Sequence, residues 1–119
     1  MKRNPVREKS YRFALEAIGL HRELVKAREF VLSRQFLRAA TSVGANVEEG
    51  LAGQSRRDFV AKMSLASKEA REAHYWLRLI RDSRMVSADA ANGLLEQCDE
   101  LVRMLTSIVK TARGRPEDP

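Results

Sequence analysis

Cysteine, proline and aromatic residues are scarce in this sequence of 119 residues. Cys98 is the single cysteine, so the chain cannot form an intramolecular disulfide. No apolar run approaches the roughly 20 residues that a membrane-spanning helix needs. The basic start, MKRNPVREKS, is not followed by the apolar segment of a secretory signal. These absences predict a cytoplasmic protein with no membrane partner.

Charged residues, in contrast, are abundant. They make up 32% of the chain, beside 44% hydrophobic residues, a balance typical of one helix-rich globular domain. Lysine and arginine outnumber aspartate and glutamate by 22 to 16, which gives a net charge of +6. A basic balance of this kind is compatible with nucleic acid or an acidic membrane surface as a partner, and requires neither.

Apolar residues recur along the chain at alternating steps of four and three, the spacing of helices that pack along a seam. The pattern is clearest after the turn at LAGQ, in Phe59, Met63, Ala66, Ala70, Ala73, Leu77 and Ile80. The segment before this turn is rich in small residues, which let a second helix approach closely: Ala39, Ala40, Ser42, Gly44 and Ala45. We therefore expect these two segments to form a helical hairpin, covered by two more helices.

The expected helix boundaries divide the chain into three parts. We expect residues 1–9 to form a flexible basic lead-in and residues 10–113 to form the helices. Residues 114–119 (GRPEDP) are expected to form a disordered tail. A short connection is expected at residues 28–32. The expected N-caps are serines, whose hydroxyl accepts a hydrogen bond from a free N–H of the first turn: Ser10, Ser33, Ser55 and Ser87. Four helices with short loops predict an all-α fold, an antiparallel up-down-up-down four-helix bundle.

Small and polar positions in the second helix are candidates for packing or interface roles. Gly44 costs roughly 1 kcal/mol relative to alanine inside a helix, which indicates close packing against a neighbour. Ser42 and Asn46 are four residues apart and share a helix face. They could bind a ligand or, as the favoured interpretation, bridge helices and fix their register. Glu49, one turn further, is expected to extend this polar network.

The third helix offers a second set of candidates. Glu69 and Glu72 are one turn apart, as paired catalytic carboxylates would be, but their basic neighbours Lys68 and Arg71 favour salt bridges. Trp76 is compatible with a platform on which a base stacks. Its apolar surroundings in the sequence favour a contact with the core or with another subunit.

Three stretches of the sequence resemble a known family: AATSVGANVEEG, SRRDFVAKMSLASKEAREAHYWLRLI and LVRMLTSIVKTA. They are similar to bacterial four-helix-bundle proteins first noted as open reading frames in intervening sequences of 23S ribosomal RNA genes. The resemblance covers residues 10–113 and implies a four-helix bundle that assembles as a homopentamer. A more distant resemblance, in architecture more than in these motifs, is to the accessory variability proteins of diversity-generating retroelements. Those proteins are basic and work with a reverse transcriptase and nucleic acid.

Motifs that would indicate an enzyme or a cofactor site are missing. A di-metal bundle uses Glu-x-x-His, and neither His21 nor His74 has a glutamate three residues before it. Arg71 and His74 share a helix face, as a helical ribonuclease would require, but such a pair is common by chance. Cys98 falls on the apolar seam of the last helix and is expected in the core. We therefore expect no catalytic residues, no metal and no cofactor.

Basic side chains on the second and third helices carry the remaining functional signal. The candidates for contacts with nucleic acid are Arg34, Arg38, Arg56, Arg57, Lys62, Lys68, Arg71, Arg78 and Arg81. They form no continuous stripe and no base-reading motif is present, so the binding they predict is electrostatic and non-specific, to RNA or DNA. We expect a non-enzymatic homo-oligomer, a pentamer by family resemblance. The alternative is a scaffold that binds a protein partner and has no role with nucleic acid.

Overall fold

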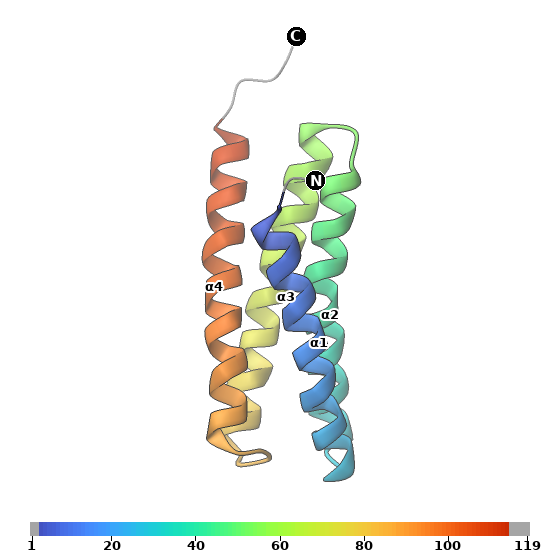
Figure 1. Cartoon of the computed structure of the whole chain (residues 1–119), viewed down its shortest axis with the longest axis vertical. Coiled ribbons are helices and arrows are strands. Elements are labelled where there is room, and N and C mark those ends of the chain that lie inside the picture. Colours follow the sequence, from blue (N-terminus) through green and yellow to red (C-terminus); the bar gives the residue numbers. More distant parts are fainter. Residues whose placement is uncertain (1–2, 115–119) are drawn as a thin grey trace.

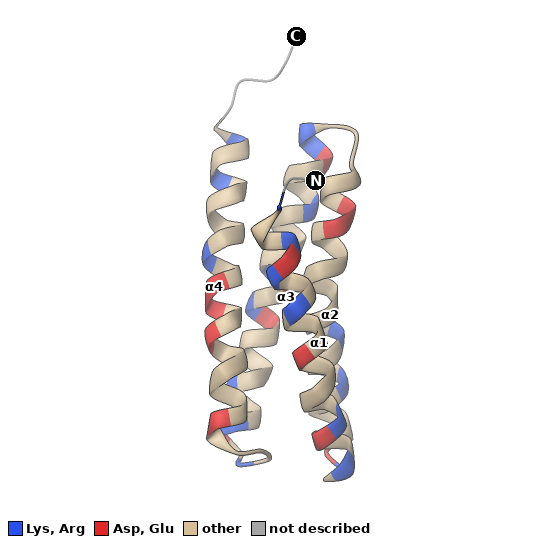
Figure 2. Cartoon of the chain, viewed as in Figure 1, with Lys and Arg blue, Asp and Glu red and all other residues tan. Residues whose placement is uncertain are grey.

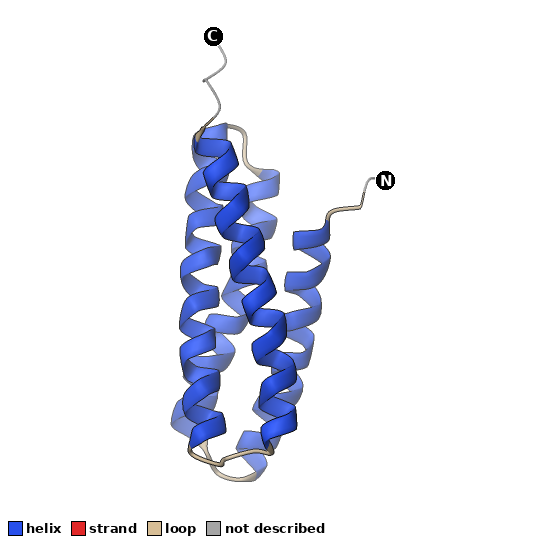
Figure 3. Ribbon diagram, turned by 90° about the vertical axis from the view of Figure 1, so that its left-hand side faces the viewer, coloured by secondary structure: helices blue, strands red, loops and turns tan. Residues whose placement is uncertain are grey.

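Four α-helices make up nearly all of the part of the chain that the structure describes, residues 3–114. In this computed structural model the helices are α1 (Pro5–Lys26), α2 (Phe30–Ala52), α3 (Arg56–Asp82) and α4 (Ala88–Arg113) (Figure 1). Successive helices run in opposite directions, and the described residues contain no strand (Figure 3). The predicted all-α, antiparallel up-down-up-down four-helix bundle is therefore confirmed.

The helices lie in a ring, in which each contacts the two that neighbour it. The contact between α2 and α3 is the most extensive, and that between α1 and α4 is the least. Alanine side chains at a contact let two helix backbones approach closely, and the buried alanines of α2 and α3 are Ala39, Ala40, Ala66, Ala70 and Ala73. The hairpin of α2 and α3 is thus the most extensively packed pair of the bundle.

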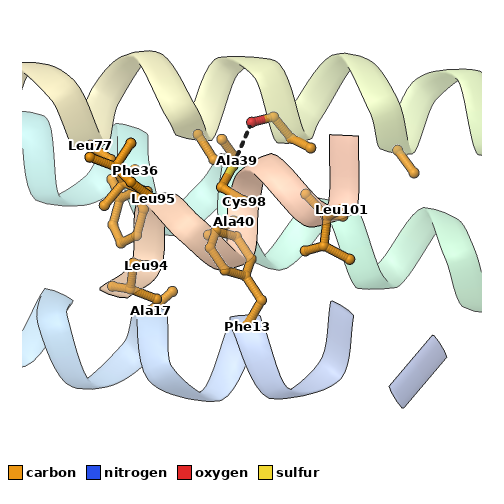
Figure 4. Close-up of a cluster of buried hydrophobic side chains, with 14 of the residues drawn as sticks. Phe13, Ala17, Phe36, Ala39, Ala40, Leu77, Leu94, Leu95, Cys98 and Leu101 are labelled. Carbon is orange, nitrogen blue, oxygen red and sulfur yellow. Dashed lines mark hydrogen bonds between the residues drawn. The ribbon is translucent and has the colours of Figure 1, made fainter. Parts of the chain in front are cut away.

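Apolar side chains from all four helices fill the interior (Figure 4). Phe13 of α1 and Phe36 of α2 are its largest fully buried side chains. Cys98 of α4 is also fully buried, as predicted. Its thiol donates a hydrogen bond to the carbonyl oxygen of Ala70 at 3.0 Å, which links α4 directly to α3.

The start of α1 differs from the prediction. The helix begins at Pro5, and the side chain of Asn4 caps it by accepting a hydrogen bond from the N–H of Arg7 at 3.1 Å. Ser10, the predicted cap, is buried inside the helix, where its hydroxyl donates to the carbonyl of Arg7. Residues 5–9 are therefore helical rather than a flexible lead-in, because proline is well suited to the first helical position after an asparagine cap. Residues 1 and 2 lie outside the described part.

The connection between α1 and α2 is shorter than predicted. It covers residues 27–29, and α2 begins at Phe30 after Glu29, whose side chain makes no capping bond. Arg28 has a φ of 62°, a left-handed conformation that reverses the chain within these few residues. The prediction of Ser33 as an N-cap is wrong, since its hydroxyl donates to the carbonyl of Phe30 within the first turn of α2.

The other two predicted caps are confirmed. The hydroxyl of Ser55 accepts from the N–H of Asp58 at 3.1 Å, and that of Ser87 accepts from the N–H of Ala90 at 3.3 Å. The last helix ends at Arg113 with Gly114 as its C-cap. The tail predicted to be disordered lies outside the described residues except for Gly114.

Gly44 lies on the side of α2 that faces Ser10 of α1. An added Cβ would lie 3.4 Å from the backbone carbonyl oxygen of Ser10, an ordinary van der Waals contact with the other helix. The predicted packing of this glycine against a neighbouring helix is confirmed, but an alanine would also fit at this position.

We expect Ser55→Ala to lower the free energy of unfolding by about 1 kcal/mol, because the substitution removes the acceptor that caps the first turn of α3. Chemical denaturation followed by circular dichroism measures this loss. Ser55→Gly is the matched control and should cost only a few tenths of a kcal/mol, since glycine is itself a tolerated N-cap. Equal losses for the two variants would contradict a capping role.

Candidate nucleic-acid interface

Arg38 of α2 pairs with both glutamates that the sequence places in salt bridges. Its guanidinium lies 3.2 Å from the carboxylate of Glu69 and also pairs with Glu72, both on α3. The expected salt bridges form, but the prediction of Lys68 and Arg71 as their partners is wrong. One guanidinium that faces two carboxylates across a helix contact helps to fix the register of α2 against α3. Arg38 is therefore a weaker candidate for a phosphate contact than an arginine without an acidic partner.

The polar network predicted around Asn46 takes a different form. The amide of Asn46 donates to the backbone carbonyl of Ser42 at 2.9 Å. The hydroxyl of Ser42 in turn donates to the backbone carbonyl of Arg38 at 2.7 Å. Both bonds run within α2, in place of the helix-bridging role that the sequence favours. The link from this end of α2 to α3 is instead an ion pair between Glu49 and Lys62 at 3.5 Å.

The remaining basic candidates differ in their surroundings. Arg81 pairs with the adjacent Asp82 at 2.9 Å, and Arg78 lies over the ring of Tyr75, 5.6 Å from its centroid. Arg56 is half-buried at the start of α3. Five candidates are exposed and form no ion pair with another described residue: Arg34, Arg57, Lys68, Arg71 and Arg78. They lie on different parts of α2 and α3, so they do not by themselves form a site.

Trp76 is half-buried and packs against the core. Its ring meets that of Tyr75 edge to face, with the centroids 5.2 Å apart. The indole N–H is buried and finds no hydrogen-bond acceptor among the described residues. This position suits the core-contact interpretation better than a platform for a base, because a stacking platform needs an open ring face.

Both histidines link pairs of helices. The Nε2 atom of His74 on α3 lies 2.9 Å from a carboxylate oxygen of Asp99 on α4. The Nδ1 atom of His21 on α1 lies 3.2 Å from the backbone carbonyl oxygen of Ser33 on α2. Within residues 3–114, no three or more histidine, cysteine or acidic side chains are grouped so that they could hold a metal ion.

A groove of about 460 Å³ between α3 and α4 gathers basic side chains from both helices. Its polar lining consists of Ser64, Ser67 and Arg71 from α3 and Thr106, Lys110 and Arg113 from α4. Of its three cations, only Arg71 is among the candidates predicted from the sequence. Lys110 and Arg113 were missed because the prediction considered the basic residues of the second and third helices alone.

Two arginines reach across this groove in opposite directions. Arg71 of α3 donates to the hydroxyl of Thr106 on α4, and Arg113 of α4 donates to the hydroxyl of Ser64 on α3, each at 3.5 Å. Both distances exceed the usual 2.7–3.2 Å range of N–H···O bonds, so these contacts are weak. A guanidinium in such a contact keeps most of its donors available, and an anion can replace the hydroxyl as its partner.

Charge is segregated along α4 (Figure 2). Residues 88–100 contain acidic side chains and no lysine or arginine, whereas residues 101–113 contain no aspartate or glutamate. The basic residues of this second half are Arg103, Lys110 and Arg113. Cations near a helix C-terminus are favoured by the helix dipole, which accounts for the stability of this arrangement. The segregation is also the signal in the sequence that points to Lys110 and Arg113.

Comparison with known proteins identifies the family. A family model described as "23S rRNA-intervening sequence protein" matches residues 2–107. The chain belongs to the 23S rRNA-intervening sequence protein family. It is similar to a crystal structure of a protein with unknown function, from the S23 ribosomal protein family, of Bacteroides thetaiotaomicron VPI-5482. The two share 38% sequence identity over 88% of this chain and 98% of that chain, with a TM-score of 0.85. None of the curated proteins matches the chain.

Membership of the 23S rRNA-intervening sequence protein family confirms the resemblance seen in the sequence motifs. At 38% identity and a TM-score of 0.85, the solved relative shares the bundle fold with this family member. Across the described residues, none of the helices combines the length and apolar character needed to cross a membrane. The surface feature of this family member with the most defined chemistry is the groove between α3 and α4.

Proposed function

We propose that this family member is a non-enzymatic, homo-oligomeric four-helix-bundle protein that binds nucleic acid non-specifically through its basic surface. The observation that carries the proposal is the gathering of Arg71, Lys110 and Arg113 in the α3–α4 groove, with no carboxylate among the lining residues. Contacts between cations and phosphates supply essentially all of the affinity of non-specific nucleic-acid binding. A groove of this composition is suited to such contacts.

The overall charge supports the same conclusion. The chain carries a net charge of +6. Several of its acidic side chains form ion pairs with basic residues outside the α3–α4 groove. Lys9 pairs with Glu100 at 2.8 Å between α1 and α4, and Arg7 pairs with Glu48 at 2.8 Å between α1 and α2. The hydrogen bond from Lys9 lowers the pKa of Glu100, which keeps that carboxylate charged and paired. The net positive charge is therefore carried by basic side chains that form no such ion pair with an acidic side chain.

Exposed apolar side chains support the oligomeric part of the proposal. Tyr11 and Leu15 of α1 are 64% and 54% exposed, and Val31 of α2 is 67% exposed. Tyr11 and Leu15 are four residues apart on one face of α1, and neighbouring exposed apolar side chains of this kind are typical of contacts between subunits. A pentamer, which the family resemblance implies, would carry the basic groove five times. One nucleic-acid chain could then engage several grooves at once, which raises the overall affinity without new contacts.

We expect the purified protein to bind structured RNA and duplex DNA with affinities that fall steeply as salt rises. Three phosphate contacts per protomer predict a slope of about −3 in a plot of log K against log salt for duplex DNA, because each contact contributes about −0.9. Fluorescence anisotropy of labelled RNA and DNA across a salt series measures this slope and shows which polymer is preferred. Absence of binding at low salt, or binding that salt leaves unchanged, would contradict the proposal.

A protein-binding scaffold with no nucleic-acid role is the second candidate, and the exposed side chains of Tyr11, Leu15 and Val31 favour it. Under this alternative the positive charge serves solubility. Apolar contacts with a protein partner would survive salt that dissociates phosphate contacts. A protein complex that persists at high salt, together with no RNA or DNA binding at low salt, would decide for the scaffold.

A further inference from the structure

The α3–α4 groove has the length of a short stretch of nucleic-acid backbone. Arg71 contacts Thr106 and Arg113 contacts Ser64. Along the groove, Arg71 of α3 therefore lies opposite Thr106 of α4, and Ser64 of α3 lies opposite Arg113 of α4. Ser64 and Arg71 are about two helical turns apart, and the groove between them is therefore about 10 Å long. Lys110 lies between the two arginines along this length, so neighbouring cations are separated by about 5 to 6 Å along the helix axes.

The groove offers hydrogen-bond donors of two kinds along its whole length. Each guanidinium carries five N–H donors in a planar fork, and the ammonium of Lys110 adds three. The hydroxyls of Ser64, Ser67 and Thr106 can donate to an oxygen that approaches the seam. A phosphate group presents several acceptor oxygens, and a set of cations interleaved with hydroxyls satisfies them from more than one side.

Acidic side chains of α3 and α4 stand away from this groove. Glu69 and Glu72 of α3 pair with Arg38 on the side that faces α2. Asp99 of α4 is bonded to His74, and Glu100 of α4 pairs with Lys9 of α1. None of these four carboxylates lines the groove. Its positive potential is thus not offset locally by an acidic side chain among the described residues.

We propose that this groove binds consecutive phosphate groups of one nucleic-acid strand through Arg71, Lys110 and Arg113. The inference rests on the proposed function and assigns it to one defined place on each protomer. Neighbouring phosphates of one strand are further apart in space than their rise of about 3.4 Å along a duplex axis, because a sugar joins them. This spacing is comparable with the roughly 5 to 6 Å between neighbouring cations of the groove, so each cation can face one phosphate. The groove is open to solvent rather than enclosed, which lets a continuous strand pass through it. Its lining also includes Val109, an apolar side chain suited to contact with a sugar.

The test compares two triple variants that remove the same charge from different parts of the bundle. The groove variant carries Arg71→Gln, Lys110→Gln and Arg113→Gln. The control carries the substitutions Arg12→Gln, Arg22→Gln and Lys26→Gln on α1, a helix that has no contact with α3 and contributes no residue to the groove. All six positions are exposed, and glutamine is about as good a helix former as lysine or arginine, so both variants should keep the fold. Circular dichroism and size-exclusion chromatography check that they do.

For a labelled single-stranded RNA, we expect the groove variant to bind at least about tenfold more weakly than the wild type at low salt, and the control to lose much less. The slope of log K against log salt should fall by about 2 in the groove variant, because each lost contact with a single strand removes about 0.7. Equal losses in the two variants would overturn the groove assignment while leaving non-specific binding by the basic surface intact. A wild type that binds no RNA or DNA at all would overturn both.

A competition arm distinguishes a strand from a small phosphorylated ligand. Inorganic phosphate and a nucleoside monophosphate are titrated against the bound RNA at constant ionic strength, and direct binding of the mononucleotide is measured by calorimetry. We expect both to compete only at concentrations far above the RNA dissociation constant, since each supplies one phosphate in place of several. Tight mononucleotide binding that the groove variant loses would overturn the strand assignment, because the groove would then be a site for a free phosphate ester.

Discussion

Phe36→Ala is expected to lower the free energy of unfolding by about 3 to 5 kcal/mol. The ring of Phe36 is fully buried in the interior of the bundle and belongs to the same apolar cluster as Leu77 and Leu95 (Figure 4). Truncation to alanine removes apolar surface that folding buries and leaves a cavity that the surrounding helices fill only in part. For a chain of this length the midpoint of thermal unfolding should fall by about 10 to 20 °C.

Phe30→Ala is the matched control for this prediction. Phe30 is the same residue type at the start of the same helix, but it is 49% exposed, so its truncation should cost about 1 kcal/mol or less. Denaturation followed by circular dichroism measures both variants. The protein concentration is held equal, because assembly of subunits couples stability to concentration. Similar losses for Phe30 and Phe36 would mean that the packing around Phe36 differs from that described above.

The apolar pattern was sufficient to predict the four helices. In α3, for example, every strongly periodic position between Met63 and Ile80 is buried. Residue type alone was insufficient for the start of α1. Asn4 and Ser10 are equally good N-caps by residue type. The structure uses Asn4 because the added turn buries Val6, which is only 4% exposed, against the core. The turn at Arg28 was missed for a related reason, because a left-handed conformation at a non-glycine residue has no clear signal in the sequence.

The candidate site was predictable only in part, because it depends on which helix faces meet. Arg71 can be assigned from the sequence as a basic residue on α3, but its neighbours in the groove belong to α4. Lys110 and Arg113 join it only through the antiparallel register of the two helices. The same reasoning explains Arg38, whose carboxylate partners lie more than thirty positions further along the chain. Charge alone therefore identified basic residues that are engaged in pairing and missed two that line the groove.

Near pH 8, the thiol of Cys98 is expected to react with iodoacetamide about a thousandfold more slowly in the folded protein than in the unfolded chain. This ratio follows from the fraction of the thiol that is ionised in each state. Burial, assisted by the negative charge of Asp99, raises the pKa of Cys98 from 9.0 to about 12. The reactive species is the thiolate, and its fraction falls tenfold for each unit by which the pKa exceeds the pH. Near pH 8 it is about one in ten for the unfolded chain and about one in ten thousand for the folded one.

The pH dependence of this reaction tests the cause directly. Because the pKa is raised, the thiol of the folded protein stays protonated through neutral pH, and its reaction rate should still be rising about tenfold per unit at about pH 9. In denaturant the rate should level off above about pH 9, which is the matched control. Mass spectrometry after timed labelling measures both rates. A folded-state rate that levels off near pH 9 would show that the thiol is in contact with water. It would then contradict the hydrogen bond from Cys98 to Ala70 as a link between α4 and α3. An unreactive Cys98, in contrast, is a structural part of the helix contact on which the basic groove is built.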